Sequence, residues 1–200
     1  MIAIPLIRRE LTSELLGRHI YLFGADCAPA EVLRRLAESG AQEGTVVLCD
    51  LEGRRLSAAV LFRPDLAVGA VSLFSATATL ALAEAIGHGD RGAMPIWPDL
   101  VTVDDRIVGR SVVESAAAGD RTSYVILGAD IDVRALHDTS HDTGDLNVMI
   151  AAFLNALNKW SAAYAACDPA AVRGVIRFLP RGFAPVRESP GGMQCASASS

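Results

Sequence analysis

The order of the predicted secondary-structure elements is the feature that most constrains the fold of this chain. Short apolar segments rich in β-branched residues predict strands, and brief turns join some of them as in antiparallel hairpins. Two longer segments, residues 71–86 and 146–164, carry apolar residues at helical spacing. The resulting order is strand, helix, hairpin, helix, hairpin, strand, helix. It favours an α+β fold, with helices packed on one side of a mixed, mostly antiparallel sheet.

Local signals set the bounds of the other elements. A further helix is predicted to begin near Pro29, after the capping residue Asp26, and to end at Gly40. Residues 95–99 predict an irregular segment, and residues 138–145 predict a polar loop. Strands are expected over residues 17–24, 45–49, 56–62, 101–103, 107–113, 124–133 and 172–179.

Composition limits the class of protein. The chain has 200 residues, of which 51% are hydrophobic and 20% are charged, so it is expected to fold as one domain over residues 1–188. Residues 189–200 are of low complexity and predict a loose tail. The net charge of −5 argues against a nucleic-acid binder, and no apolar run approaches the ~20 residues of a membrane span. The opening residues show no secretory signal, so we expect a cytoplasmic protein.

The cysteines do not predict a metal site. Cys27, Cys49, Cys167 and Cys195 are far apart in the sequence and form no CxxC motif. Two histidines four residues apart fall in or beside the predicted polar loop, where no shared helix face would bring them together. We therefore expect buried or unreactive thiols and no metal-binding cluster.

The segment from residue 96 to residue 114 carries a resemblance. Trp97, Pro98 and Asp99 are followed by Val-Asp-Asp-Arg-Ile-Val-Gly and then by an apolar stretch. This resembles the central motif of the biotin/lipoate protein ligase family, in which Lys-Trp-Pro-Asn-Asp precedes a turn, Lys-Leu-Ala-Gly and a strand. Other parts of that family's catalytic domain resemble residues 40–47, 58–64, 73–85, 127–133 and the helix from residue 146. The resemblance covers about residues 20 to 165.

The resemblance implies a reaction. Ligases of this family condense biotin or lipoate with ATP to an acyl-adenylate and pass the acyl group to a lysine of an acceptor protein. The resemblance therefore implies a small carboxylic acid of the biotin, lipoate or octanoate type as ligand, an acceptor protein as partner, and ATP and Mg²⁺ as cofactors if the chain is an active ligase. By analogy with the family, it also suggests a homodimer formed through a sheet edge.

The resemblance also implies site residues. Arg106 takes the place of the second motif lysine and would stabilise developing negative charge, while Gly109 matches the motif glycine. Asp99 and Asp132 would hold Mg²⁺ or ribose. Trp97, with the hairpin of residues 101–113, would wall an apolar pocket. The short Gly53-Arg54-Arg55 segment would supply arginines to a phosphate.

The sequence departs from the family pattern in two cationic elements. Most of the family's Gly- and Arg-rich loop is absent between Cys49 and Leu56, and Ile96 replaces the lysine before Trp97. Asp132 also stands where the family has asparagine. Three functions stay open: an ATP-dependent ligase, a binding or interaction module without catalysis or cofactor, and an ATP-independent acyltransferase with Cys49 as nucleophile.

Structural roles compete with these assignments. Trp97 would serve equally as a core aromatic residue, and Asp99 as a turn cap. Gly53-Arg54-Arg55 is also an ordinary hairpin turn, and Cys49 an ordinary buried thiol.

Overall fold

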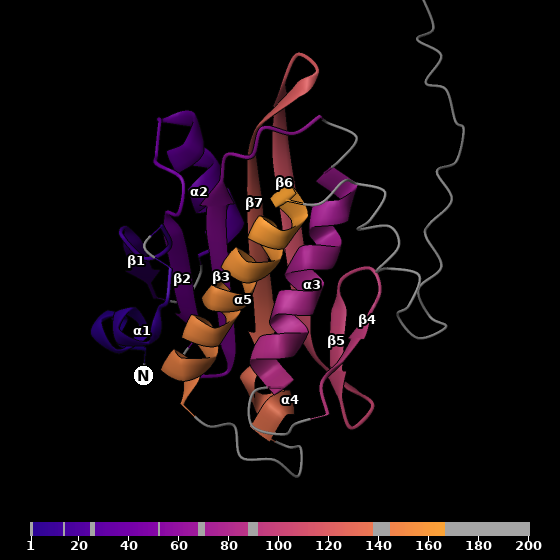
Figure 1. Cartoon of the computed structure of the whole chain (residues 1–200). Coiled ribbons are helices and arrows are strands. Elements are labelled where there is room, and N and C mark those ends of the chain that lie inside the picture. Colours follow the sequence, from indigo (N-terminus) through magenta and orange to yellow (C-terminus); the bar gives the residue numbers. More distant parts are fainter. Residues whose placement is uncertain are drawn as a thin grey trace, which may run out of the picture.

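The fold is built on a single mixed sheet. A computed structural model of the chain describes residues 2–13, 15–24, 27–51, 53–67, 71–87, 92–137 and 145–166. The strands in these segments are β1 (Ile20–Phe23), β2 (Val46–Leu51), β3 (Arg55–Phe62), β4 (Met94–Ile96), β5 (Leu100–Val103), β6 (Arg106–Ala118) and β7 (Arg121–Asp132). They are ordered β1-β2-β3-β7-β6-β5-β4 across the sheet (Figure 1). The β1–β2 pair is parallel and the other neighbours are antiparallel, which confirms the predicted mixed, mostly antiparallel sheet.

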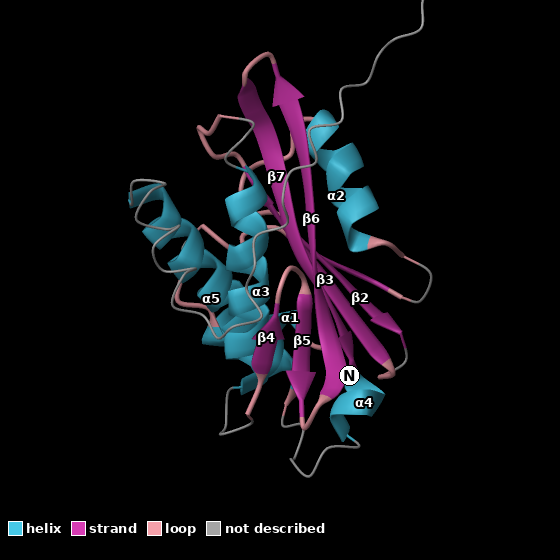
Figure 2. Ribbon diagram, turned by 90° about the vertical axis from the view of Figure 1, so that its right-hand side faces the viewer, coloured by secondary structure: helices cyan, strands magenta, loops and turns pink. Residues whose placement is uncertain are grey.

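Helices cover both faces of this sheet. The described helices are α1 (Ile4–Glu10), α2 (Pro29–Glu38), α3 (Val71–Gly87), α4 (Val133–His137) and α5 (Leu146–Ala166). Figure 2 shows α3 and α5 on one side of the strands and α2 on the other. The prediction that the helices share one side is therefore wrong for α2. The physical reason is a second core, in which Leu33 and Ala37 of α2 pack on side chains such as Val47 and Leu61.

The larger core lies between the sheet and the α3–α5 pair. The small side chains of Ala78, Ala81 and Ala85 are buried, and they let α3 lie close to the strands. Phe153 and Leu157 of α5 pack into the same cluster. None of the helices in the described segments has the length and apolar content that crossing a bilayer requires.

Both predicted hairpins are confirmed. The β2–β3 pair is antiparallel, and β5 and β6 are joined at Asp104 and Asp105, whose φ angles of 50° and 60° are those of a tight type I′ turn. The helices predicted over residues 71–86 and 146–164 correspond to α3 and α5.

Other elements differ from expectation. Residues 94–96 form the edge strand β4, which overlaps the start of the segment 95–99 predicted to be irregular, because these residues pair with β5. The short helices α1 and α4 have no counterpart in the prediction. The strand predicted at 172–179, the tail, and residues 138–144 of the polar loop lie outside the described residues.

Candidate functional site

Charged and polar side chains gather on the α2 face of the three central strands. Ser57 of β3 lies directly opposite Asp130 of β7, which in turn lies opposite Arg110 of β6. Because directly opposed residues of antiparallel strands point to the same face, these three side chains form one row. Arg55 and Asp132 are paired two residues further along the same strands. They add a second polar row about 7 Å away on that face.

Small apolar residues lie on the other side of this polar row. Ala59, Gly128 and Val112 are opposed across β3, β7 and β6. A Cβ atom at Gly128 would lie 2.8 Å from the carbonyl oxygen of Ala58, so a residue with a side chain does not fit here without a shift of the backbone. Two residues beyond Val112, the half-buried Glu114 lines the same face. The floor thus changes from charged to apolar along the strands.

A cleft of about 450 Å³ lies over this floor. Its wall is the beginning of α2, through residues that include Cys27, Pro29, Glu31 and Arg34. The floor residues that line it are Arg55, Ser57, Ala58, Ala59, Val112, Glu114, Gly128, Ala129 and Asp130. A cavity of this size, lined by an apolar stretch beside charged and polar side chains, suits a small organic ligand that carries a polar group.

A second cavity of about 500 Å³ adjoins the cleft and is rich in arginine. The two cavities share Arg55 and Asp130. The arginine-rich cavity is lined by Arg54, Arg55, Ile107, Val108, Gly109, Arg110, Asp130, Asp132 and Arg134. Four arginines against two aspartates give this cavity a positive balance, as an anion requires.

Hydrogen bonds fix the groups at the junction of the two cavities. The Ser57 hydroxyl donates to Asp130 Oδ1 at 2.5 Å, and Arg55 Nη2 donates to Asp130 Oδ2 at 2.8 Å. Arg110 Nε lies 3.5 Å from Asp99 Oδ2. An arginine has five N–H donors, so Arg55 and Arg110 keep donors for an anionic ligand.

The Trp97–Asp99 segment is held in place by α3 and β6. Thr79 of α3 donates its hydroxyl hydrogen to the Pro98 carbonyl at 2.8 Å, and the Ser111 N–H of β6 donates to the Asp99 carbonyl at 2.7 Å. Asp99 reaches the site through its pair with Arg110. Trp97 is half-buried and is not among the described residues that line either cavity, so the expected pocket beside it does not coincide with the cleft.

The two residues of β6 that the resemblance selects, Arg106 and Gly109, differ in their relation to the cavities. Arg106 is exposed at the first position of the strand and is not among the described residues lining either cavity. Gly109 lines the arginine-rich cavity. The structural need for Gly109 comes from the other face, because a Cβ atom there would lie 3.0 Å from Leu82 Cδ2 of α3. Ile107, Val108 and Arg110 of the same strand also line this cavity, and Ile107 and Arg110 are exposed.

The remaining predicted arginines and Asp132 do come together. Gly53 takes a φ of 69° in the β2–β3 turn, and its N–H donates to Asp50 Oδ1 at 3.0 Å. Arg54 and Arg55 follow and line the arginine-rich cavity. Asp132 lines it too, while its Oδ1 accepts a hydrogen bond from the Ala135 N–H at 2.9 Å in the first turn of α4.

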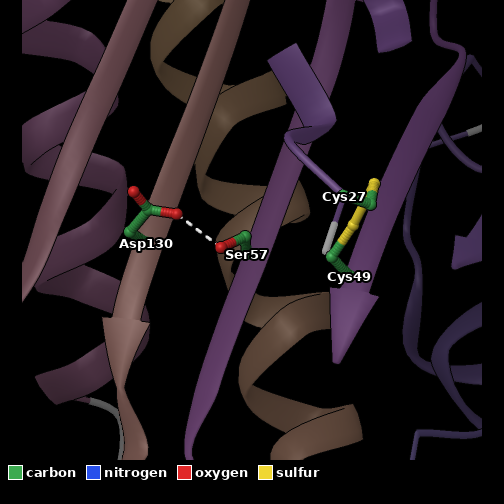
Figure 3. Close-up of a disulfide and its surroundings, with 4 residues drawn as sticks. All are labelled: Cys27, Cys49, Ser57 and Asp130. Atoms are coloured by element: carbon green, nitrogen blue, oxygen red, sulfur yellow. Dashed lines mark hydrogen bonds between the residues drawn. A yellow bond between two sulfur atoms is a disulfide. The ribbon is translucent and has the colours of Figure 1, made fainter. Parts of the chain in front are cut away.

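Cys49 is not a thiol in this structure. Its sulfur is bonded to that of Cys27, as Figure 3 shows, so the expectation of unpaired thiols is wrong for these two residues. The two cysteines are 22 positions apart and gave no local signal in the sequence, because it is the fold that brings β2 to the start of α2. A nucleophilic Cys49 would require reduction of this disulfide. Within the described segments, no group of three or more His, Cys, Asp or Glu side chains forms a metal site.

Tyr124 is the group near the α2 face whose acidity is clearly altered. Burial, reinforced by the negative charge of Glu38, raises the pKa of the Tyr124 phenol above its ordinary value. Tyr124 belongs to the core beneath α2, so it acts there as a neutral, packed side chain.

The structure also brings in residues that the sequence reading did not select: Arg34, Ser57, Arg110, Glu114, Asp130 and Arg134. For some of these residues, their spacing in the sequence does indicate a shared face of the sheet. Arg55 and Ser57, Arg110 and Glu114, and Asp130 and Asp132 lie at even spacing within strands, which puts each pair on one face.

Comparison with solved structures identifies the fold. The chain superposes on a biotin protein ligase-like protein of unknown function from Silicibacter sp. TM1040 with a TM-score of 0.68 and 13% identity, over 84% of this chain and 79% of that one. The biotin protein ligase of Aquifex aeolicus gives a TM-score of 0.61 at 15% identity, over 81% and 77% of the two chains. The ligase of Leishmania major in complex with biotinyl-5-AMP gives 0.52 at 14% identity, over 88% and 87%.

These superpositions define a biotin protein ligase-like fold, which confirms the fold that the resemblance implies. A scan of the sequence against protein-family models gave no match, and a search of the curated proteins gave none either. The likeness therefore extends to the fold of the chain, while its activity has to be argued from its own site.

Proposed function

We propose that this chain binds a small carboxylic acid, or the adenylate of that acid, in the cleft between α2 and the sheet. The observation that carries the proposal is the junction of two complementary cavities at Arg55 and Asp130. One has an apolar part of its floor, formed by residues such as Ala59, Gly128 and Val112, which suits an acyl body. The other presents four arginines, which suit a carboxylate or a phosphate.

The proposed reaction is that of a divergent biotin/lipoate protein ligase. A carboxylate oxygen of the acid attacks the α-phosphate of ATP, and pyrophosphate leaves as the acyl-adenylate forms. Negative charge develops on the phosphate oxygens in this step, and fixed cations stabilise it. In this proposal Arg54, Arg55, Arg110 and Arg134 supply that charge, rather than Arg106.

The site also fits a nucleotide that carries Mg²⁺. Mg²⁺ is usually held by one or two carboxylates together with substrate phosphates, and Asp130 and Asp132 both line the arginine-rich cavity. When bound, the ion would neutralise part of the phosphate charge. Asp99 is less suited to this task than expected, because it is not among the described residues that line the arginine-rich cavity.

Transfer of the acyl group completes the proposed activity. The amine of an acceptor lysine would attack the acyl carbonyl, and AMP would leave. An ATP-using reaction of this kind agrees with the cytoplasmic location that the sequence favours. The structure described for the Aquifex ligase with biotin and ATP shows that this fold can hold both molecules in another protein.

A second candidate is a binding module that keeps the fold without the chemistry. The observation in its favour is at Ile96, which replaces the family's lysine and is 47% exposed without any charge to offer. The third candidate, an acyltransferase using Cys49, requires the reduced form of the chain.

Thermal unfolding with a panel of ligands separates these candidates. Biotin, lipoate and octanoate would each be tested with and without ATP and Mg²⁺, since a ligand that binds the folded chain raises the midpoint by mass action. A ligase is stabilised most by one acid together with the nucleotide, and a binding module by the acid alone. A thioester trapped on Cys49 after reduction, and absent in Cys49→Ser, would identify the acyltransferase. If none of the acids shifts the midpoint, the proposal is wrong.

A further inference from the structure

The Cys27–Cys49 disulfide belongs to the wall of the cleft. Cys27 lines the cleft just before α2, while Cys49 is fully buried in β2. Cys49 is directly opposed to Ser57, which is opposed to Asp130, so the bond continues the polar row of the floor. Figure 3 shows the disulfide beside the Ser57–Asp130 hydrogen bond. The bond thus joins the wall of the cleft to β2, the strand next to the floor.

Among the described residues, the first turn of α2 is held by packing: Pro29 is buried, and Cys27 and Ala30 pack against the core beneath α2. The residue that caps it, Ala28, offers no side-chain hydrogen bond, and Pro29 packs into the protein but has no N–H to donate. The opposite end of the helix is better held, because Arg63 Nη2 donates to the Ala37 carbonyl at 3.0 Å. The pair between Glu31 and Arg35 lies within the helix and ties it to nothing else. Near the cleft, the disulfide is the covalent anchor of the wall.

The two sulfurs differ in access. Cys27 is half-buried at the cleft, whereas Cys49 is completely buried. A thiolate of a small dithiol would therefore attack the Cys27 sulfur, and Cys49 would leave as a thiolate. The second thiol of the reductant then closes a cyclic disulfide and releases Cys27. The dithiol loses two electrons and two protons, and the two cysteines become thiols.

We propose that this disulfide is a redox control of the cleft. With the bond formed, Cys27 holds the first turn of α2 over the floor; with the bond reduced, that turn is released and the cleft loses part of its wall. In a reducing cytosol such a bond is transient, so oxidation would be the signal that closes the wall. The mechanical part of this inference stands on the structure, and only its effect on a ligand rests on the proposed function.

Hydrogen exchange tests the mechanical part. The Cys167→Ser/Cys195→Ser variant leaves Cys27 and Cys49 as the only cysteines of the chain, so it is the form to oxidise and reduce. On reduction we expect the amides of residues 32–34, the first that are hydrogen-bonded within α2, to exchange about tenfold faster while those of β7 do not change, as in local opening. The Cys27→Ser/Cys49→Ser variant should match the reduced form. Unchanged exchange at residues 32–34 would overturn the inference, and so would faster exchange throughout the sheet.

Ligand titration tests the functional part. Biotin, lipoate and octanoate would be titrated into the oxidised and the reduced protein in the presence of ATP and Mg²⁺. We expect the dissociation constant of the acid that binds to rise about fivefold or more when the disulfide is reduced. By reciprocity, the bound acid should favour formation of the disulfide by the same factor. Equal affinity in the two forms would overturn the control of binding. If no acid binds to either form, the proposed function is contradicted. The hydrogen-exchange experiment would then still show whether reduction frees the first turn of α2.

Discussion

The Ser57 hydroxyl donates a hydrogen bond of 2.5 Å to Asp130 Oδ1, and this contact lies at the junction of the cleft and the arginine-rich cavity. The second oxygen of Asp130 accepts from Arg55 at 2.8 Å. One carboxylate therefore orients a hydroxyl and a guanidinium group from the neighbouring strand. The site depends on this cross-strand register, since a shift of one residue would turn these side chains to the α3 face.

Ser57→Ala is expected to destabilise the fold modestly. Ser57 is buried, and its loss leaves Asp130 Oδ1 without this donor, which corresponds to about 1 kcal/mol of unfolding free energy. Urea unfolding would measure the change. The exposed Ser115→Ala on β6 is the control, with an expected effect within about 0.5 kcal/mol. Equal effects of the two variants would contradict the importance of the Ser57–Asp130 contact.

Replacing Arg110 with alanine should slow adenylate formation more than replacing Arg106. Arg110 lines the arginine-rich cavity, whereas Arg106 is exposed at the start of the same strand. We expect at least a tenfold loss for Arg110→Ala and for Arg55→Ala, equivalent to about 1.4 kcal/mol of transition-state stabilisation. Pyrophosphate exchange is the assay. A larger loss in Arg106→Ala would instead support the assignment implied by the motif.

The two glycines of β6 and β7 should differ in their tolerance of alanine. At Gly128 a Cβ atom would lie 2.8 Å from a backbone oxygen, that of Ala58, which cannot move aside, so a loss of about 1–3 kcal/mol is expected. At Gly109 the nearest atom is the end of the Leu82 side chain at 3.0 Å, so the loss should be smaller. Gly24→Ala, with no atom within 4 Å of the new Cβ, is the control. Denaturant unfolding of all three variants would contradict this order if Gly109→Ala proved the least stable.

Asp145 should make the fold less stable at acid pH than at neutral pH. The backbone N–H and the side-chain amide of Asn147 donate to Asp145 Oδ1 at 2.8 and 2.7 Å, and these bonds hold the pKa of the carboxyl below its usual 3.8. The pKa of Asp145 is therefore lower in the folded state than in the unfolded state. The ionised carboxylate contributes its full share of the unfolding free energy at any pH above the unfolded-state pKa. That share is lost as the pH falls through the folded-state pKa. Asp145→Ala should therefore cost about 1 kcal/mol at neutral pH, as for a lost helix cap, and less in strong acid.

Unfolding of the wild type and of Asp145→Ala at pH 7 and at about pH 3 would check this dependence. The exposed turn residue Asp120 supplies the matched control, Asp120→Ala. A difference between wild type and Asp145→Ala that grows as the pH falls would contradict the sign argued here.

Much of the sheet could be predicted because its signals are local. Apolar runs bounded by turn residues marked β2, β3 and β7, and helical spacing marked α3 and α5. The three-residue β4 could not be predicted in this way, because it contains Pro95 and exists through its pairing with β5. The side of the sheet that α2 covers was missed because both faces of β2 and β3 are apolar, so periodicity alone does not assign the helix to one of them.

The site was less accessible to sequence reasoning than the fold. Motif matching selected Arg54, Arg55 and Asp132, which the structure brings to one cavity. It could not select Asp130 or Arg110, whose meeting depends on the register between β6 and β7. The Cys27–Cys49 bond was missed for a similar reason, since only the tertiary fold brings these cysteines together.

Direct titration of a variant with a filled cleft tests the central claim, that the cleft between α2 and the sheet binds a small carboxylic acid. Val112 is half-buried on the cleft floor, so Val112→Trp would occupy the space above it. The control Ala117→Trp places the same indole at an exposed position of the same strand, outside the cavities described. With biotin, lipoate or octanoate and ATP with Mg²⁺, we predict saturable binding of at least one acid to the wild type and to Ala117→Trp. Val112→Trp should weaken that binding by about tenfold or more, or 1.4 kcal/mol. Equal binding by Val112→Trp, or no binding of any acid to the wild type, would contradict the claim.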